Sequence, residues 1–565
     1  MKAIEIPVLI VGAGPTGVTA GLLLQRLGIA QRIVERRPGP QRAPAAHCVN
    51  ARTFEVFRQA GIDMNAVDAA ATNPADAGFV HWVTKLGGEV IGSLPYERQG
   101  DEVLELTPTP LRNLSQHRLE PILVDALVDA GAAAPFYSHQ WESATQDTDG
   151  VVSHLRDLDT GEAYEVRSRY LLAADGAGSP IRKWLGIQPV GPDRIQSFVM
   201  IHFEANLREA VGQCPGVLYW ICDPEGMSTL VAHDIDREWV YMHPWNPERE
   251  PRELYDESTC ERLVRRCLAR ADVALQIRSI STWTMTAQVA ERYRDRRVFL
   301  LGDSAHRFPP TGGLGLNTGV QDAHNLVWKI AAVDGGRAGD ALLDSYENER
   351  RPVAQNNAEQ SMRNAFRLFE VTEALGLSDD PEVSRTNMAA ALSDAAGRQR
   401  LNAAIANQAE HFDMLGLQLG FAYETGALVA DGSSPILPSN PVREFVPSTR
   451  PGARLPHGWV RRGGARISTL DLIELDTFTL LTGPRGNEWV EAVSDGIRCV
   501  QIGRDVEDVD GWWTKVADMS AGGALLVRPD QHVAFRSRDA SNDARGALER
   551  ALAAVMNPHL GVSGS

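Results

Sequence analysis

Hydrophobic and polar positions at the start of the chain follow two different periods. A continuous apolar run at 6–11 is followed by a glycine-rich turn, a helical pattern at 15–28 and a second short strand, RIVE, at 32–35. Short apolar runs bounded by glycine are typical of buried strands, whereas apolar residues three and four positions apart are typical of a helix. The pattern therefore predicts a βαβ unit.

Later segments predict further sheets and helices. Residues 75–100 and 190–285 are rich in Trp, Tyr, Val and His with short alternations, which favours one antiparallel sheet built from two distant segments. Residues 296–333 predict a strand, a loop and a long helix, and residues 339–425 are mostly helical by period. Prolines from 435 to 451 indicate a linker, beyond which strands and helices suffice for a separate α/β domain.

Composition and charge exclude several classes of protein. With 43% hydrophobic and 23% charged residues, the chain is typical of globular proteins. Its net charge of −17 disfavours nucleic acid and anionic membranes as partners. The six cysteines form no CxxC pair, and no run of 18 apolar residues occurs. We expect a cytoplasmic protein without a metal site, a nucleic-acid partner or a membrane partner.

The turn of the βαβ unit carries a nucleotide-binding motif. Gly12, Gly14 and Gly17 follow the first strand directly, and Glu35 lies 18 residues after the last glycine. Such glycines let the backbone approach a pyrophosphate at a helix N-terminus, and the acidic residue accepts hydrogen bonds from a ribose. The neighbouring Arg36 and Arg37 leave a 2′-phosphate open as an alternative. The motif indicates a dinucleotide without distinguishing FAD from NAD.

Two further motifs each follow a predicted strand, AADGAGSPIR around Asp175 and LLGDSAHRFPPTGGLGLNTGVQDAHNLVWK around Asp303. Together with VGAGPTG, and in this order, they make the chain similar to the FAD-dependent aromatic hydroxylases, the single-component class A flavoprotein monooxygenases. The resemblance implies tightly, non-covalently bound FAD, with Asp303 on its ribityl chain, Asp175 associated with FAD and NADPH, and the loop after Pro309 against the isoalloxazine. The implied cofactor-binding residues are Gly12, Gly14, Pro15, Thr16, Gly17, Glu35, Arg36, Arg42, Gln116, Asp175, Asp303, Pro310, Gly313, Gly315, Leu316 and Asn317.

The family chemistry implied by the resemblance is hydroxylation of a phenolic ring through a flavin C4a-hydroperoxide. NADPH or NADH would bind transiently as reductant, because only one GxGxxG is present, and O2 would be the second substrate. The substrate would be a small aromatic compound whose hydroxyl needs a base. His47 falls where several simple-phenol hydroxylases of the family carry a His and others an Asp; a His that only ties the loop is the alternative.

Other residues of the predicted sheet are weaker candidates for the pocket. Tyr219 and Asp234 could assist His47 in catalysis, and His233, Tyr241 and Pro309 could join His47 in binding substrate. Aromatic residues at period two are also typical of a plain core, which remains the alternative for the sheet residues.

The fold class predicted is α/β, with a Rossmann-like FAD-binding domain, an inserted antiparallel-sheet substrate domain and a C-terminal domain similar to the thioredoxin-like domain of the phenol hydroxylase branch. That last domain has a lone Cys499 in place of CxxC, so we expect it to be structural or part of a homodimer interface. The predicted ranges are 1–75, 101–185 and 286–350 for the FAD domain, 76–100 and 186–285 for the sheet domain, 351–430 for a helical segment, 431–452 for a linker and 453–565 for the C-terminal domain.

Three alternative functions stay open at this point. The same fold could hydroxylate a polycyclic aromatic polyketide. A flavin halogenase or another non-hydroxylating flavin oxidoreductase is a second alternative, although the WxWxIP motif of halogenases is absent. A protein that holds FAD without turnover is the third.

Overall fold

The computed structural model describes residues 4–270 and 272–558, so residues 1–3 and 559–565 at the ends of the predicted first and last domains lie outside the described residues. The predicted βαβ unit is present as β1 (Ile4–Val11), α1 (Pro15–Arg26) and β2 (Gln31–Val34), with β1 and β2 parallel. The helix begins at a proline, which needs no hydrogen-bond partner for its nitrogen at that position.

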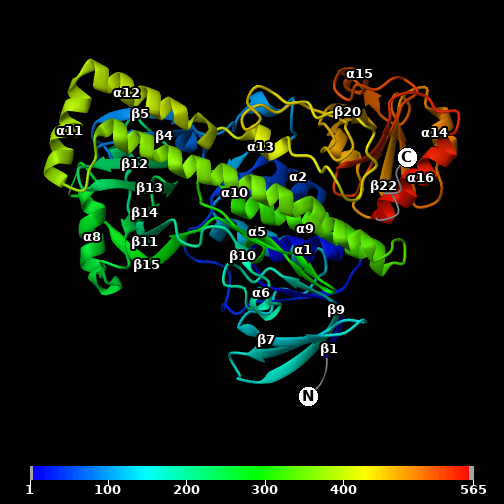
Figure 1. The fold of residues 1–565 in the computed structure, drawn as a ribbon, viewed down its shortest axis with the longest axis horizontal. Coiled ribbons are helices and arrows are strands. Elements are labelled where there is room, and N and C mark those ends of the chain that lie inside the picture. The colour runs from blue at the N-terminus through cyan, green and yellow to red at the C-terminus, as the bar shows by residue number, and fades with distance from the viewer. Residues whose placement is uncertain (1–3, 271, 559–565) are drawn as a thin grey trace.

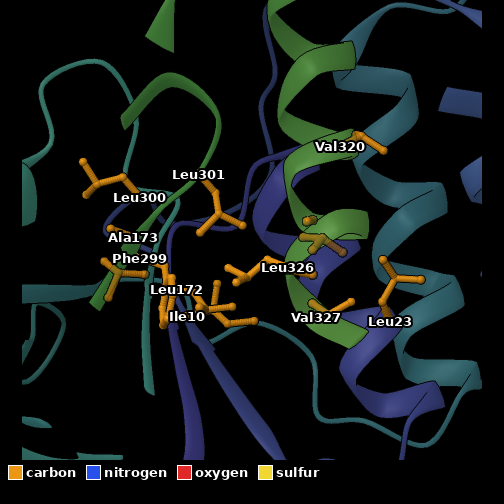
Figure 2. Close-up of a cluster of buried hydrophobic side chains, with 14 of the residues drawn as sticks. Ile10, Leu23, Leu172, Ala173, Phe299, Leu300, Leu301, Val320, Leu326 and Val327 are labelled. Atoms are coloured by element: carbon orange, nitrogen blue, oxygen red, sulfur yellow. The ribbon is translucent and has the colours of Figure 1, made fainter. Parts of the chain in front are cut away.

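The first sheet has the strand order β17-β18-β9-β1-β2. Its central strands β1, β9 and β18 are parallel, and β7 and β8 extend β9 as an antiparallel hairpin. The added strands are β7 (His139–Gln146), β8 (Val151–Asp157), β9 (Ala163–Ala173), β17 (Arg294–Asp295) and β18 (Val298–Leu300). Figure 2 shows Ile10, Leu172 and Leu301 packed against Leu326 of α9 (Leu314–Asp334). This packing explains why the ends of β1 and β9 and the short strand β18 are apolar.

The second sheet has the order β15-β11-β14-β13-β12-β4-β5 and is antiparallel except for the pair β12 and β4. Its strands are β4 (Phe79–Val83), β5 (Val90–Pro95), β11 (Gln196–Glu204), β12 (Leu218–Asp223), β13 (Gly226–Asp234), β14 (Glu238–Trp245) and β15 (Gln276–Met285). One face packs on α8 (Glu257–Arg266) and the other on the helices after α9 (Figure 1). Two distant segments thus build one sheet that is covered on both faces.

A helix of 35 residues, α10 (Ala341–Leu375), crosses from the first sheet to the second (Figure 1). The boundary predicted between 350 and 351 falls inside this helix, so the structure has no break in the chain at that point. Pro352 lies within α10, yet the helix continues through it. Residues of α10 on both sides of Pro352 are packed in the cores of the two domains, which stabilises the continuous helix. The helices α11 (Pro381–Ser393), α12 (Ala395–Ala406) and α13 (Leu415–Leu419) follow.

The C-terminal domain has the strand order β23-β22-β25-β26, with β22 parallel to β23 and antiparallel to β25. Its elements are β20 (Trp459–Arg462), β21 (Ala465–Ser468), β22 (Phe478–Thr482), α14 (Asn487–Ala492), β23 (Ile497–Gln501), β24 (Glu507–Asp508), α15 (Trp512–Lys515), β25 (Ala524–Val527), β26 (Val533–Ser537) and α16 (Ala544–Met556). The predicted α/β fold class is confirmed.

Shorter elements complete the chain: β3 (Cys48–Val49), α2 (Ala51–Gln59), α3 (Met64–Ala70), α4 (Pro74–Ala77), β6 (Arg112–Asn113), α5 (Gln116–Asp129), α6 (Pro180–Trp184), β10 (Pro189–Val190), α7 (Arg208–Val211), β16 (Gln288–Ala290) and β19 (His306–Arg307). None of the helices in the described part of the chain has the length and apolar character required to cross a membrane.

Candidate active site

The three sequence motifs meet at one edge of the first sheet. Val11 is in register with Ala173, and Ala173 with Leu300, so the carboxyl ends of β1, β9 and β18 lie side by side. Gly12, Asp175 and Asp303 follow these ends within a few residues. The crevice outside the carboxyl ends of parallel strands is where open α/β sheets bind their ligands.

The glycines of the first turn have different tasks. Gly12 has a φ of +109°, and a Cβ there would overlap the carbonyl of Ala174, while a Cβ on Gly17 would overlap the carbonyl of Gly12. Both are therefore required for packing. A Cβ on Gly14, the N-cap of α1, would meet no atom within 4 Å. Gly14 thus borders open space at a helix N-terminus, which fits a phosphate group.

Pro15 and Thr16 form the first turn of α1, and this turn packs on the loop that carries Asp303. A Cβ on Gly302 would lie 2.8 Å from the Thr16 hydroxyl. The close approach brings the first and third motifs into direct contact.

Glu35 is buried and organises the turn that follows β2. Its carboxylate accepts hydrogen bonds from the amides of Ala13 (3.0 Å) and Arg37 (2.9 Å) and from Nε of Arg37 (3.2 Å). Burial alone would raise the pKa of Glu35, but these amides and the Arg37 charge hold it below its ordinary value. Arg37 is thus the arginine beside the acid, whereas Arg36 is exposed.

The buried carboxylate of Glu120 joins Gln116 to the loop that carries Arg42. Gln116 donates to Glu120 (2.8 Å), which also accepts from the amide of Gln41 (2.7 Å). Arg42 is exposed. Both residues therefore border the same loop, and Arg42 is open to contact a ligand.

Asp175 and Asp303 present carboxylate oxygens that the protein leaves unpaired. Oδ2 of Asp175 accepts from the amide of Ile181 (3.2 Å), but its Oδ1 is buried and has no hydrogen-bond partner among the described residues. Asp303 is exposed, and its side chain hydrogen-bonds to no described residue. A buried acceptor without a partner is costly, so this edge fits a ligand rich in hydroxyl or amide donors, such as FAD.

The loop that carries Asp303 is held from behind by Asp322. This buried carboxylate accepts from the amide of Gly302 (3.2 Å) and from Nε of Arg350 (2.8 Å), and it bonds Nε2 of His306 (2.7 Å). Both ends of the loop 302–306 are therefore fixed to α9.

The loop from Pro309 to Asn317 joins the cofactor edge to the segment of His47. Gly313 has a φ of +62°, and a Cβ there would lie 2.5 Å from Cβ of Cys48. Asn317 accepts from the amide of Asn50 (2.9 Å) and donates to the carbonyls of Cys48 (2.9 Å) and Gly313 (2.7 Å). The side-chain amide of Asn317 thus forms its hydrogen bonds within the protein.

The other residues predicted from this loop differ in exposure. Pro309 is buried, Pro310 is exposed and Leu316 is half-buried. A Cβ on Gly315 would lie 4.0 Å from Oδ1 of Asp303. The N-terminus of α9 and the Asp303 carboxylate therefore border the same space.

His47 lies where the cofactor edge and the second sheet approach one another. Its Nδ1 is 3.0 Å from Oδ1 of Asn113, and its ring is 5.5 Å from that of His233 and 6.3 Å from that of Tyr96 between centroids. Burial lowers the pKa of His47, only partly opposed by the bond to Asn113, and lowers the pKa of His233 much further. Both imidazoles are therefore neutral near pH 7.

The structure does not bring Tyr219, Tyr241 and Asp234 to His47. Tyr219, Leu230 and Tyr241 are in register across three strands, and all three belong to the core against α8. The Tyr219 hydroxyl donates to the Cys214 carbonyl (2.9 Å). His233 lies where the register of β13 with β14 shifts, and its ring packs on that of His47 instead.

Asp234 ends β13 outside the His47 pocket. Its carboxylate accepts from the amide of Asp236 (3.0 Å) and lies 3.6 Å from the Arg118 guanidinium. Asp234 therefore contacts the turn after β13 and Arg118 rather than His47.

Several residues around His47 carried no sequence signal. Asn113 is one, and Tyr96, which stacks on His47, is another. From the helical segment, Phe412 packs on Tyr96 with a 6.2 Å centroid distance, and a Cβ on Gly312 would lie 2.8 Å from Met414. Residues 412–414 thus cover the loop that begins at Pro309, and only the tertiary structure shows this.

Known proteins resemble this arrangement over the whole chain. Residues 5–361 match the family model described as FAD binding domain, and residues 448–558 match aromatic-ring hydroxylase, C-terminal. A 2,4-dichlorophenol 6-monooxygenase of Delftia acidovorans is 34% identical over 585 residues, covering 98% of this chain and 99% of that protein. A putative polyketide hydroxylase of Streptomyces halstedii is 35% identical over 554 residues, covering 95% and 94%.

A solved structure extends the similarity to three dimensions. The flavin-dependent monooxygenase PieE, crystallised with FAD and substrate, superposes with a TM-score of 0.92 at 35% identity, covering 98% of this chain and 99% of that one. The FAD-binding model alone spans more than half of the chain, and the second model spans the C-terminal domain. The chain therefore belongs to the family of FAD-dependent aromatic-ring hydroxylases.

Proposed function

We propose that this protein hydroxylates a phenolic ring with FAD, O2 and NADPH or NADH, and that His47 is the base that accepts the proton of the substrate hydroxyl. The observation that carries the proposal is the place of His47. It is a neutral imidazole, and the next residue, Cys48, packs on Gly313 of the loop beside Asp303. A base at this position can reach a ring held near the cofactor.

Each group of residues has a task in this reaction. Gly14, Glu35, Asp175 and Asp303 would hold FAD, which when reduced supplies the activation of O2 and the transfer of one oxygen atom. His47 takes the hydroxyl proton, and the resulting phenolate directs electron density to its ring carbons. His233 and Tyr96, whose rings face His47, form walls against which an aromatic ring packs.

A panel of substrates tests the proposal. FAD-loaded protein is incubated with NADPH or NADH and compounds from simple phenols to polycyclic quinones, while cofactor oxidation, hydrogen peroxide and product are measured together. A phenol that accelerates oxidation and gains one oxygen supports the proposal. Peroxide release without oxygenated product from any compound would favour a non-hydroxylating flavin oxidoreductase.

Replacement of His47 gives the second test. His47→Ala should retain FAD but lose about 10²–10⁴-fold in kcat at neutral pH, with partial recovery at alkaline pH, where the phenol ionises unaided. In the unchanged protein the rate should fall as pH drops below the pKa of His47, which burial places under 6.5, because imidazolium accepts no proton. His154→Ala, a half-buried histidine on β8 that pairs with Glu165, is the matched control. Identical pH profiles for His47→Ala and the control would contradict the role of His47.

A polycyclic aromatic polyketide is a second candidate substrate, favoured by the equally similar polyketide hydroxylase of Streptomyces halstedii. The polycyclic members of the panel test it directly. We also propose that the protein is a cytoplasmic homodimer, as the resemblance implies, and light scattering on the FAD-loaded protein measures its mass in solution.

A further inference from the structure

The side chains behind His47 form a chain of hydrogen bonds with a fixed direction. We infer that Gln99 and Asn113 are positioning residues that keep the proton of neutral His47 on Nδ1, so that Nε2 is the atom that accepts the substrate proton. The inference deepens the proposed function and rests on it.

The direction of the chain is set at Gln99. This buried side chain donates from its amide nitrogen to the carbonyl oxygens of Ala77 (2.9 Å) and Tyr96 (2.8 Å). Carbonyl oxygens only accept hydrogen bonds, so the NH2 group of Gln99 must lie at this end. Its Oε1 is therefore directed to Asn113.

Asn113 transmits this direction to the imidazole. Its Nδ2 donates to Oε1 of Gln99 (3.0 Å), which leaves Oδ1 on the side of His47, 3.0 Å from Nδ1. Oδ1 can only accept, so Nδ1 must carry a hydrogen. In a neutral imidazole the other nitrogen, Nε2, then has a free lone pair.

The backbone keeps the two side chains in register. Cys48 pairs with Asn113 where β3 meets β6, and the amide of Leu114 donates to the carbonyl of His47 (2.7 Å). Asn113 is only 1% exposed, so water does not compete for Oδ1. Nε2 of His47, by contrast, makes no hydrogen bond with any residue that the structure describes and remains available to a substrate.

The charges around His47 are consistent with a base that stays neutral. The titratable side chains that face it are His233 from β13, Tyr96 after β5 and the adjacent Cys48; burial lowers the pKa of His233 and raises those of Tyr96 and Cys48. Glu97 follows Tyr96 directly, and burial raises its pKa to about 7; its carboxylate accepts from the amide of Met414 (3.2 Å).

The proton balance of the step follows from this geometry. The substrate O–H bond breaks, an N–H bond forms at Nε2, and the electron pair stays on the phenolate oxygen. The imidazolium then has only the neutral Oδ1 of Asn113 opposite its Nδ1–H. A carboxylate at that place would stabilise the charged ring and raise the pKa of His47.

The first experiment observes the tautomer directly. FAD-loaded protein labelled with 15N in histidine is examined by two-bond 1H–15N correlation NMR, and His47→Gln assigns the signal. We expect the Nδ1–H pattern in the unchanged protein and a shift towards the Nε2–H form in Asn113→Leu and Gln99→Leu. Asn65→Leu, an exposed asparagine on α3, should leave the pattern unchanged. An Nε2–H pattern in the unchanged protein would overturn the inference.

The second experiment measures the pH profile of phenol-dependent turnover. Asn113→Asp should move the acid limb to higher pH by about one unit or more, because the new carboxylate stabilises imidazolium. Glu97→Gln should leave the limb in place, which separates titration of His47 from that of Glu97. If the limb does not move in Asn113→Asp and the NMR pattern does not change in Asn113→Leu, the inference is wrong.

The same variants distinguish this inference from the proposed function. Loss of turnover in His47→Ala, together with an unmoved limb in Asn113→Asp and an unchanged NMR pattern in Asn113→Leu, would leave His47 as the base and remove the positioning role. Normal turnover in His47→Ala, with the Nδ1–H pattern present in the unchanged protein, would instead remove the proposed base.

Discussion

Two carboxylates at the same edge of the first sheet have different environments. Asp303 is more exposed than Asp175, but burial raises the pKa of both carboxyls, that of Asp175 to about 6 despite hydrogen bonds from Ser179 and the amide of Ile181. An ionised Asp175 at neutral pH therefore costs the FAD-free protein stability. A ligand that donates to its unpaired Oδ1 would offset that cost.

This cost should be visible as a pH dependence of stability. The folded pKa of about 6 exceeds the ordinary value of 3.8, so Asp175 contributes stability below about pH 4 that is lost as pH rises through 6. Asp175→Asn should therefore raise the free energy of unfolding of the FAD-free protein at pH 8 by up to about 3 kcal/mol and have little effect near pH 4.

Urea unfolding at the two pH values measures the difference. Asp125→Asn, an exposed position on α5, is the control and should show no such pH dependence. Equal unfolding free energies for Asp175→Asn and the unchanged protein at pH 8 would mean that the carboxylate is already stabilised without FAD.

At the scale of elements, the turn between β1 and α1 separates packing from binding. Gly12 and Gly17 are fixed by neighbouring carbonyls, whereas the position of a Cβ on Gly14 is open. The three glycines of one motif therefore have two different tasks, and substitutions can separate them.

Two alanine substitutions make that separation measurable. Gly12→Ala should lower the free energy of unfolding by about 1–3 kcal/mol, because its Cβ overlaps the Ala174 carbonyl and its φ is positive. Gly14→Ala should fold with a loss under about 1 kcal/mol but bind FAD about tenfold or more weakly, because its Cβ enters the ligand space.

Urea unfolding of the FAD-free protein and titration with FAD give the two quantities. Equal losses of stability in both variants, or undiminished FAD affinity in Gly14→Ala, would contradict the division of tasks.

The elements that the sequence predicted well are those set by local pattern. The βαβ unit and the three motifs depend on residues close together in the chain, and the structure brings Gly12, Asp175 and Asp303 to one edge. The face of each strand in the second sheet was harder to predict. On β12, for example, α8 packs on one face and α10 to α12 pack on the other, so both sets of alternating residues are apolar or aromatic. Composition alone therefore cannot distinguish Tyr219 and Tyr241, which lie in the core, from His233, which lies beside His47.

The surroundings of His47 could not be predicted from sequence for a different reason. Asn113, Met414 and the pair Tyr96 and Gln99 come from three separate segments, and none forms a motif with its neighbours. Their proximity depends on the pairing of β3 with β6 and on the packing of residues 412–414 over the glycine loop. Local pattern contains no information on either contact.

At the scale of the whole molecule, the C-terminal domain is joined to the FAD domain by buried charges. Arg528 bonds both oxygens of Glu349 on α10 (2.8 Å each) and also pairs with Asp530. Similar buried contacts link the domains elsewhere, namely Arg454 with Glu55 and Arg52 with Gln531. Such pairs tolerate the loss of one partner poorly, because the other charge is left without water.

Arg528→Met should therefore lower the free energy of unfolding by about 3–5 kcal/mol, since Asp530 would lose its paired cation and Glu349 would keep only Lys329. Arg550→Met, which removes an exposed pair with Asp543, should cost less than about 1 kcal/mol. Denaturant unfolding of both FAD-loaded variants gives the comparison. Similar small losses in the two would show that the buried pairs do not hold the C-terminal domain in place.

The continuity of α10 restricts how this enzyme can open. Along one helix, Tyr346 bonds the Leu300 carbonyl (2.7 Å), Asn364 bonds the Thr311 carbonyl (3.1 Å), and Leu375 lies in the core of the second sheet. The first and second sheets are thus both packed on a single helix about 50 Å long. Entry of a substrate then depends on small displacements of side chains and loops rather than on a hinge between domains. Relatives that act on substrates of different size should accordingly differ in the side chains of the pocket, while the distance between the two sheets stays the same.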